Sequence, residues 1–129
     1  MANLDITFYD TGGIVIGNPE YQDELLKFAG ADTVIAGTIL ARDHADNTMV
    51  PCDPAESDGT EIGIAVLTIE AANTIAGNVT VRPLMQGKVR SEKLLFHNGA
   101  VVTVPVLDML RAFGIIPITV DELNQLDNF

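Results

Sequence analysis

The side chains that could carry catalytic or metal chemistry are few and widely spaced. Cys52 is the single cysteine, and His44 and His97 are the two histidines. A thiol nucleophile needs a neighbouring base that a third group orients, and no motif links Cys52 to either histidine. One cysteine also excludes an intrachain disulfide and a zinc site built from four thiolates. We therefore interpret Cys52 as a small apolar core residue and both histidines as exposed loop residues.

A group of carboxylates between residues 43 and 61 is the candidate for a calcium site. Calcium needs several converging oxygen ligands, and this segment contains enough of them. The spacing does not follow the alternating ligands of an EF-hand loop, and Asp58-Gly59 is typical of a simple turn. We therefore expect no bound metal. The carboxylates concerned are Asp43, Asp46, Asp53, Glu56 and Asp58.

Motifs for phosphate binding or covalent carrier chemistry are missing. Gly12-Gly13 and Gly17 do not form a Gly-x-Gly-x-x-Gly turn that opens a helix, and there is no Walker loop. Lys88 lies in a short strand without the motif that surrounds the lysine of lipoyl or biotinyl domains. No Gly-x-Ser-x-Gly elbow occurs either. We expect no enzyme activity and no cofactor.

The charge distribution argues against nucleic acid and anionic membranes as direct partners. The formal net charge is -11. Residues 1–60 contain eleven Asp and Glu against two Lys and Arg, whereas residues 61–129 contain seven against five. A nucleic-acid binder needs a basic surface, and aromatic residues for stacking are scarce, at 5% with no Trp. The acidity favours solubility, or a partner that carries positive charge.

The chain is long and apolar enough for one domain with apolar surface to spare. Its 129 residues can bury a core without disulfides, and its mean hydropathy is +0.26. No run approaches the roughly 18 apolar residues of a membrane helix, so the apolar side chains must line a core or an interface. The first residues lack the basic and apolar regions of a secretory signal, and we expect synthesis in the cytoplasm.

Residues 1–23 are expected to form a flexible N-terminal arm. Their short apolar groups are interrupted by Asp10 to Gly13 and by Gly17-Asn18-Pro19, which are turn and loop signals. Such a segment either packs back on the domain or orders on a partner surface, and the sequence leaves both open. The apolar side chains expected to anchor it are Ile6, Phe8, Tyr9, Ile14 and Ile16.

Residues 24–129 are expected to form a single β-rich domain. Short apolar runs alternate with turn residues, and their close spacing leaves no room for helical crossovers between parallel strands. The fold class is therefore α+β and mainly β, with an antiparallel or mixed sheet. The strongest strand is residues 60–69, with Ile62, Ile64 and Val66 on one side. The other expected strands are residues 25–29, 33–35, 38–40, 49–50, 78–81 and 87–90.

Two short helices are expected near the end of the domain. Over residues 104–113, Pro105 suits the first turn of a helix and Gly114 suits a left-handed stop. Thr119 to Glu122 matches a capping box, which predicts a last helix over residues 120–127. The apolar stripe of the first helix consists of Val106, Leu107, Leu110 and Phe113.

The order and spacing of the strand motifs resemble a known family. Over about residues 36–95 the pattern is similar to the phage head decoration proteins typified by the decoration protein of phage lambda. In that family, a strand, a variable polar loop, a strand that ends in aspartate and an Asp-Gly turn follow one another. The matching motifs are Gly37 to Arg42, Met49 to Asp53, Ser57 to Thr60, Ile62 to Leu67, Asn78 to Val81 and Met85 to Arg90.

This resemblance implies a β-rich, small barrel-like domain that assembles as a homotrimer over the local three-fold positions of a capsid. It also implies an N-terminal arm that orders on the major capsid protein. The protein would then be a structural virion component on the outer surface of the phage head, where it stabilises the expanded, DNA-filled shell. Addition of the arm to the edge of a capsid sheet is a natural mode of binding.

Two other classes of protein stay open at this point. One is a small β-barrel module that binds a metal or metabolite, which predicts a monomer with a pocket and ligand-dependent melting. The other is a different virion subunit, such as a tail-tube or head-completion protein, which predicts rings of other symmetry. The mass of the protein in solution separates these classes, because only the decoration protein is expected to be a trimer.

Overall fold

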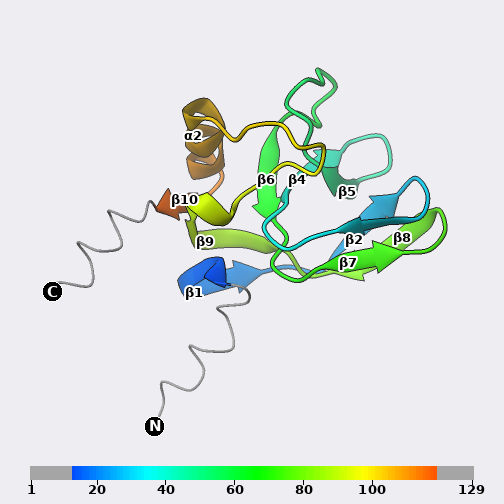
Figure 1. Ribbon diagram of the computed structural model, residues 1–129, viewed down its shortest axis with the longest axis horizontal. Coiled ribbons are helices and arrows are strands. Elements are labelled where there is room, and N and C mark those ends of the chain that lie inside the picture. Colours follow the sequence, from blue (N-terminus) through cyan, green and yellow to red (C-terminus); the bar gives the residue numbers. More distant parts are fainter. Residues whose placement is uncertain (1–12, 119–129) are drawn as a thin grey trace, which may run out of the picture.

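A computed structural model of the chain describes residues 13–118, which form a curled β-sheet with one short α-helix (Figure 1). This architecture confirms the expected α+β, mainly β class. The elements, in chain order, are β1 (Val15–Tyr21), β2 (Glu24–Phe28), β3 (Asp32–Val34), β4 (Ile39–Asp43), β5 (Thr48–Pro51), β6 (Gly63–Val66), β7 (Ala71–Asn73), β8 (Gly77–Val81), β9 (Leu84–Arg90), the 3-10 turn η2 (Ser91–Lys93), α2 (Val104–Ala112) and β10 (Ile115–Ile118).

The main sheet runs in the order β1-β9-β6-β4-β5-β2-β8 and curls into a half-barrel. Its pairs are antiparallel except for β2 with β5, which are parallel. β10 lies parallel to β9, so the second half of β9 lies between β1 and β10. The short strands β3 and β7 form a separate antiparallel pair. The sheet is therefore mixed, which is one of the two arrangements expected from the close spacing of the strands.

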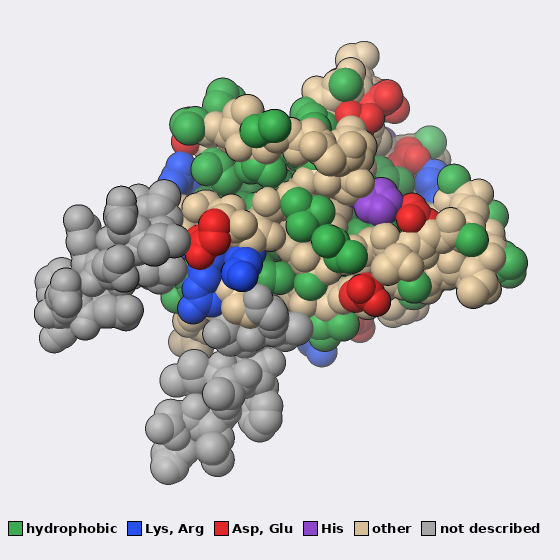
Figure 2. Space-filling view, in the orientation of Figure 1, with side chains coloured by type: hydrophobic (Ala, Val, Ile, Leu, Met, Phe, Trp, Pro, Cys, Tyr) green, Lys and Arg blue, Asp and Glu red, His purple; other side chains and the backbone are tan. Residues whose placement is uncertain are grey.

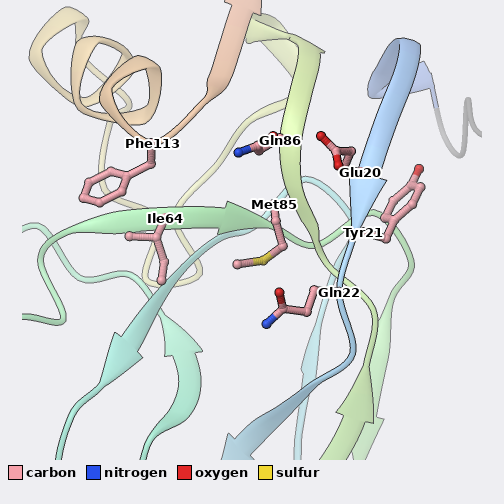
Figure 3. Close-up of a pocket in the computed structure, with 7 residues that line it drawn as sticks. All are labelled: Glu20, Tyr21, Gln22, Ile64, Met85, Gln86 and Phe113. Atoms are coloured by element: carbon pink, nitrogen blue, oxygen red, sulfur yellow. The ribbon is translucent and has the colours of Figure 1, made fainter.

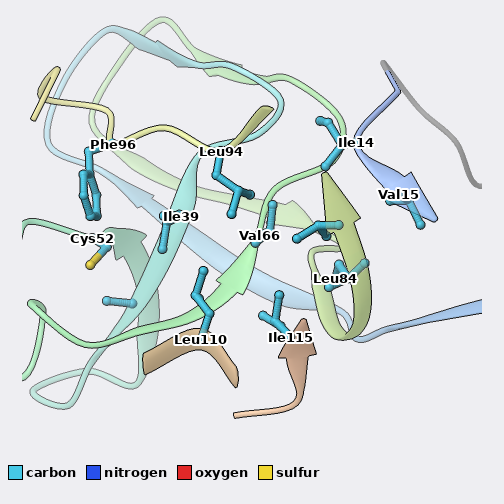
Figure 4. Close-up of a cluster of buried hydrophobic side chains, with 12 residues drawn as sticks. Ile14, Val15, Ile39, Cys52, Val66, Leu84, Leu94, Phe96, Leu110 and Ile115 are labelled. Carbon is cyan, nitrogen blue, oxygen red and sulfur yellow. The ribbon is translucent and has the colours of Figure 1, made fainter. Parts of the chain in front are cut away.

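One face of the sheet is covered by α2 and by the segment of residues 91–102. Leu110 of α2 is fully buried on this face, and Leu94 and Phe96 cover its neighbouring part (Figure 4). We call this group the helix-covered cluster. Its buried members are Ile14, Val15, Ile39, Ala41, Cys52, Val66, Leu84, Val89, Leu94, Phe96, Leu110 and Ile115.

The other face of the sheet folds over a second apolar group, to which α2 contributes no side chain. Successive residues of a strand point to opposite faces, so Ile39 joins the first cluster and Leu40 joins the second. We call this group the strand-lined cluster. Its buried members are Leu26, Phe28, Val34, Leu40, Met49, Ala65, Leu67, Ala71 and Val81.

The helix expected near residues 104–113 is confirmed as α2. Pro105 lies in its first turn, and Gly114 has a φ of 91°, the left-handed conformation that ends a helix. Phe113, the last member of the expected apolar stripe, is the residue at which the helix ends, and its side chain is 46% exposed. The helix expected over residues 120–127 lies outside the described residues.

The expected N-terminal arm differs from the structure over its second half. Residues 15–21 form β1, an edge strand that pairs with β9, and Ile14 is buried at 2% exposure. The ladder accommodates the glycine and proline of this stretch through a register shift between Ile16 and Glu20. Packing on the domain, one of the two alternatives left open, therefore applies to residues 14–21.

The strand expected over residues 60–69 is shorter than its sequence pattern. Before it, the N–H of Gly59 donates to Glu61 Oε1 at 2.8 Å and holds a turn, so Ile62 precedes β6 and is 37% exposed. The expectation that Ile62 lies in the strand, on one side with Ile64 and Val66, is therefore wrong. Gly63 begins β6 because a Cβ there would lie 2.5 Å from Ile39 Cγ2, and only glycine lets these two strands approach so closely.

Candidate functional site

Cys52 is a core residue. Its side chain is 1% exposed and belongs to the helix-covered cluster. Burial, together with the carboxylates of Asp53 and Glu61, raises the pKa of the Cys52 thiol to about 12. Such a thiol is protonated at neutral pH and is a poor nucleophile. The interpretation of Cys52 as a small apolar core residue is confirmed.

His97 joins two loops through its side chain. Its Nε2 lies 2.7 Å from Asp32 Oδ2, and this hydrogen bond lowers the pKa of Asp32. Next to it, the side-chain amide of Asn98 donates to Asp53 Oδ1 at 3.1 Å. The expectation of an exposed loop histidine holds for His44 but not for His97, whose side chain is 30% exposed and paired. These contacts fasten loops and do not activate a nucleophile.

The carboxylates considered for calcium hold turns and ion pairs. Lys27 Nζ lies 2.6 Å from Asp43 Oδ2 and 2.8 Å from Asp46 Oδ2. Asp53 and Asp58 each accept a backbone N–H from two residues further along the chain. Within residues 13–118, no group of three or more His, Cys, Asp or Glu side chains is placed to hold a metal ion. These carboxylates therefore serve local folding.

A second ion pair ties β2 to β4. The guanidinium of Arg42 donates to both carboxylate oxygens of Glu24, at 2.6 and 3.1 Å, and the two side chains are only 17% and 10% exposed. This bidentate contact lowers the pKa of Glu24. Lys27 and Arg42 are the only Lys and Arg residues among the first 60. Both cations of the acidic half of the chain are thus engaged in its own folding.

A groove lined by both polar and apolar side chains opens on the surface where the margin of the strand-lined cluster meets the end of α2; its polar lining residues are Glu20, Gln22, Arg42, His44 and Gln86. It consists of two neighbouring hollows of about 410 and 220 Å³ that share Ile64 and Phe113. In Figure 3, Phe113 and Ile64 lie close together and Met85 follows along the groove. We define the groove by its apolar lining residues, which are Tyr21, Ile62, Ile64, Met85 and Phe113.

No local feature of the sequence predicted the groove as a unit. Its residues come from the end of β1, the approach to β6, β9 and the end of α2, so only the folded sheet brings them together. Phe113 was expected on the apolar stripe of a helix, and Met85 lay between two of the expected strands. An aromatic side chain at the residue where a helix ends is the one local feature that could have pointed to an exposed ring.

The start of the described chain is firmly fixed to the domain. Ile14 and Val15 are buried in the helix-covered cluster, and Ile14 accepts the N–H of Arg90 at 2.8 Å. The Arg90 guanidinium also donates to the carbonyl of Gly13. Ile16, the next candidate anchor, is half-buried on the opposite side of β1. The other candidate anchors, Ile6, Phe8 and Tyr9, lie outside the described residues.

The described residues therefore offer surfaces for contact and no assembled reaction centre. Neither histidine is placed beside Cys52 as a base, and the hollows are open to solvent. In the part of the chain from residue 13 to residue 118, no helix combines the length and apolar character needed to cross a membrane. Among the described residues, the groove and the edge of β1 that no described strand pairs with are the surfaces most suited to contact with other proteins.

Comparison with known proteins assigns this architecture to a family. The family model of the bacteriophage lambda head decoration protein D matches residues 14–115. No curated protein matches the chain at a significant level. The match begins at Ile14, where the core begins, and ends at Ile115 in β10, so it covers β1 and α2 as well as the strands that carried the resemblance. The chain belongs to the family of the bacteriophage lambda head decoration protein D, whose members are structural proteins of the phage capsid.

Proposed function

We propose that this protein binds the outer surface of an icosahedral phage capsid as a homotrimer and stabilises the expanded, DNA-filled head. The observation that carries the proposal is the family match over residues 14–115, which includes nearly the whole described domain. The protein would be a structural component that works by burying surface, without catalysis and without a cofactor.

The attachment of β1 supports a role for the first residues in capsid binding. β1 pairs with β9 on one side, and no described strand pairs with its other side. Residue 13 therefore starts from a fixed position at a sheet edge, and edges of this kind accept added strands. We propose that Ile6, Phe8 and Tyr9 in the preceding segment contact the capsid, together with Ile16 near the start of β1. Ile14 fixes the start of β1 to the core.

The groove supports a homotrimer. A three-fold ring needs two different patches on each subunit, because each contact joins one patch to another. Apolar side chains that stay exposed in a hollow, such as Phe113 at 46% and Ile62 at 37%, suit the receiving patch. A trimer that contacts several capsid subunits at once converts modest contacts into tight binding through multivalency.

The proposal is tested by incubating purified protein with undecorated, expanded heads and measuring co-sedimentation and resistance to heat or chelator. We expect the intact chain to bind and to raise the resistance of the heads. Deletion of residues 1–12 is expected to remove most of the binding while the far-ultraviolet circular dichroism stays unchanged. Val101→Ser, a change at a 78% exposed side chain far from the arm in the sequence, is the control. Failure of the intact, folded chain to bind heads would overturn the capsid-binding role.

The homotrimer is tested separately by light scattering on the intact chain and on Phe113→Ser. We expect a trimer for the intact chain and weaker association for the variant, because serine removes the ring from the groove. Phe113 is half-exposed, so the subunit is expected to stay folded. A trimer of unchanged stability in the variant would remove the groove from the interface. A monomer under all conditions, including on heads, would overturn the homotrimer itself.

A further inference from the structure

The outward face of β1, β9 and β10 carries a row of three side chains that no described element covers. Ile16 pairs with Lys88, and Lys88 pairs with Ile116, so the three lie side by side across the strands and point to the same side. Lys88 is exposed, Ile116 is 42% exposed and Ile16 is half-buried. We call them the outer row. It combines two aliphatic side chains with a cation.

Two further cations lie next to the outer row. A Cβ placed on Gly13 would lie 3.6 Å from a guanidinium nitrogen of Arg90 and 3.9 Å from Lys93 Cε, so these two side chains converge on one glycine. Arg90 is two residues from Lys88 on the same face of β9. In Figure 2, Lys and Arg side chains gather over β1 and β9, with a carboxylate beside them. We call Lys88, Arg90 and Lys93 the cationic cluster.

Lys88 and Lys93 of the cationic cluster differ in their surroundings from four other cations of the described domain. Lys27, Arg42, Arg82 and Arg111 each pair with a carboxylate. Among residues 13–118, no carboxylate lies within ion-pair distance of Lys88 or Lys93. In a chain of net charge -11, such a cluster favours an anionic partner with apolar side chains for the two isoleucines.

We propose that the partner is the chain's own C-terminal segment, residues 119–129, which packs across the outer row of the same subunit. The segment contains Asp121, Glu122 and Asp127 and neither Lys nor Arg. Its apolar residues Val120 and Leu123 are three apart, as on one face of a helix. Charge and apolar pattern are therefore both complementary to the cationic cluster and the outer row.

The register of β10 places the attachment point of the segment beside this surface, so no linker is needed to reach it. Ile118 pairs with Arg90, so residue 119 leaves the sheet directly beside the cationic cluster. A helix of eleven residues is about 16 Å long, whereas three neighbouring strands span about 10 Å. A segment tethered at this point has an effective concentration in the millimolar range, which allows weak individual contacts to hold it.

The first twelve residues also leave the domain near Gly13, but they suit the site less well. They contain two carboxylates, Asp5 and Asp10, and no capping box or helical stripe like that of residues 119–127. They are also the segment to which we assign capsid contacts. Occupation of the outer row by residues 119–129 would leave Ile6, Phe8 and Tyr9 available for that role, whereas Ile16 would be covered within the subunit.

The test is the rate at which a small acylating reagent modifies Lys88 in the intact chain and in a chain that ends at Ile118, measured by mass spectrometry. A segment docked in about three quarters of the molecules leaves Lys88 open in about one quarter, so truncation would raise its rate about fourfold. Lys27, whose partners Asp43 and Asp46 lie elsewhere, is the internal control and is expected to keep its rate. Equal rates at Lys88 in the two chains would overturn the proposal.

Charge reversal in the intact chain covers the case in which the truncated chain does not fold. Asp121→Lys with Glu122→Lys is expected to raise the Lys88 rate as truncation does, and a synthetic peptide of residues 119–129 is expected to restore protection to the truncated chain. Protection of Lys88 in the intact chain that disappears on dilution would assign the segment to another copy and overturn docking within one subunit. Capsid binding is a separate measurement, so either proposal can fail alone.

Discussion

The helix-covered cluster and the strand-lined cluster lie on the two faces of one sheet, but they are closed in different ways. The first is sealed by α2 and by Leu94 and Phe96, and its centre is fully buried. The second has no helix above it, and its margin at Ile64 and Met85 opens into the groove. The first face is therefore closed over its apolar side chains, whereas the margin of the second leaves apolar side chains exposed.

No described helix covers the strand-lined cluster, and ion pairs between strands hold its edge. Leu26 of β2 pairs with Met49 of β5, and both are buried in this cluster. On either side of that contact, Lys27 binds carboxylates of the β4–β5 turn, and Arg42 binds Glu24. A helix supplies apolar cover to one cluster, whereas ion pairs between strands hold the rim of the other. The two clusters should therefore respond differently to cavities and to acid.

The largest effect is expected from Leu110→Ala. This change removes the most buried side chain of α2 and leaves a cavity, so we expect the free energy of unfolding to fall by about 2–5 kcal/mol. Phe113→Ala, three residues later in the groove, is the matched control and is expected to cost about 1 kcal/mol or less because its ring is half-exposed. Urea denaturation followed by circular dichroism measures both. Equal losses in the free energy of unfolding would mean that the side chains at the groove are packed as tightly as those of the helix-covered cluster.

A smaller effect is expected from Gly63→Ala. The new methyl group would lie 2.5 Å from Ile39 Cγ2 and 3.4 Å from Leu110 Cδ2, so the contact between β4 and β6 under α2 must widen. Overpacking of this kind costs about 1–3 kcal/mol. Gly30→Ala is the control, because a Cβ there meets no atom within 4 Å. A thermal melt in which both variants unfold at the same temperature contradicts the tight packing of this face.

On the rim of the strand-lined cluster, Glu24→Gln is expected to cost about 1–2 kcal/mol, the value of hydrogen bonds to a charged group that are largely shielded from water. The amide keeps the shape of the carboxylate but loses its charge opposite Arg42. Glu70→Gln, at an exposed carboxylate, is the control and should change stability little. If Glu24→Gln leaves the urea midpoint unchanged, the pair does not hold the rim.

The smallest effect concerns pH. Lys27, followed by Thr48, lowers the pKa of Asp46 from 3.8 to about 2. A depressed pKa in the folded state stabilises the fold above the unfolded value, and this contribution is lost as the pH falls from about 4 to about 2. We expect stability to decline over that window and Asp46→Asn to make the decline shallower. Gly30→Ala, measured in parallel, is the control and should show the same dependence of stability on pH as the unaltered chain. An equal dependence in Asp46→Asn would exclude the ion pair of Lys27 with Asp46 as a source of acid sensitivity.

The sequence predicted those parts of the fold whose signals are local. Pro105 and Gly114 mark the two ends of α2 within one segment, and the strands from β2 to β9 fall between recognisable turns. β7 escaped notice because its Ala71-Ala72-Asn73 lacks branched and aromatic side chains. β10 was not among the expected strands, because its strand character depends on parallel pairing with β9, which is distant in the chain.

Among the candidate site residues, only those whose role depends on their neighbours in the sequence could be predicted. Cys52 could be assigned to the core from its apolar setting, but the pairing of His97 with Asp32 joins residues 65 positions apart. β1 was assigned to the arm because Gly17 and Pro19 break its periodicity, and only the register shift shows how the ladder absorbs them. The groove and the outer row arise from several strands at once, so no single stretch of sequence contains them.

The antiparallel pairing of β1 with β9 has a mechanical consequence. A pull applied at residue 13 along the axis of β1 acts parallel to the strands, so the hydrogen bonds of the ladder are loaded in shear and share the force. A pull at right angles would instead open them one after another, like a zip. Ile14 and Val15 are buried in the core, so sliding β1 along the sheet would also expose these two side chains. If the N-terminal segment tethers the protein to the capsid, as we propose, a pull along β1 would load this ladder in its most resistant direction.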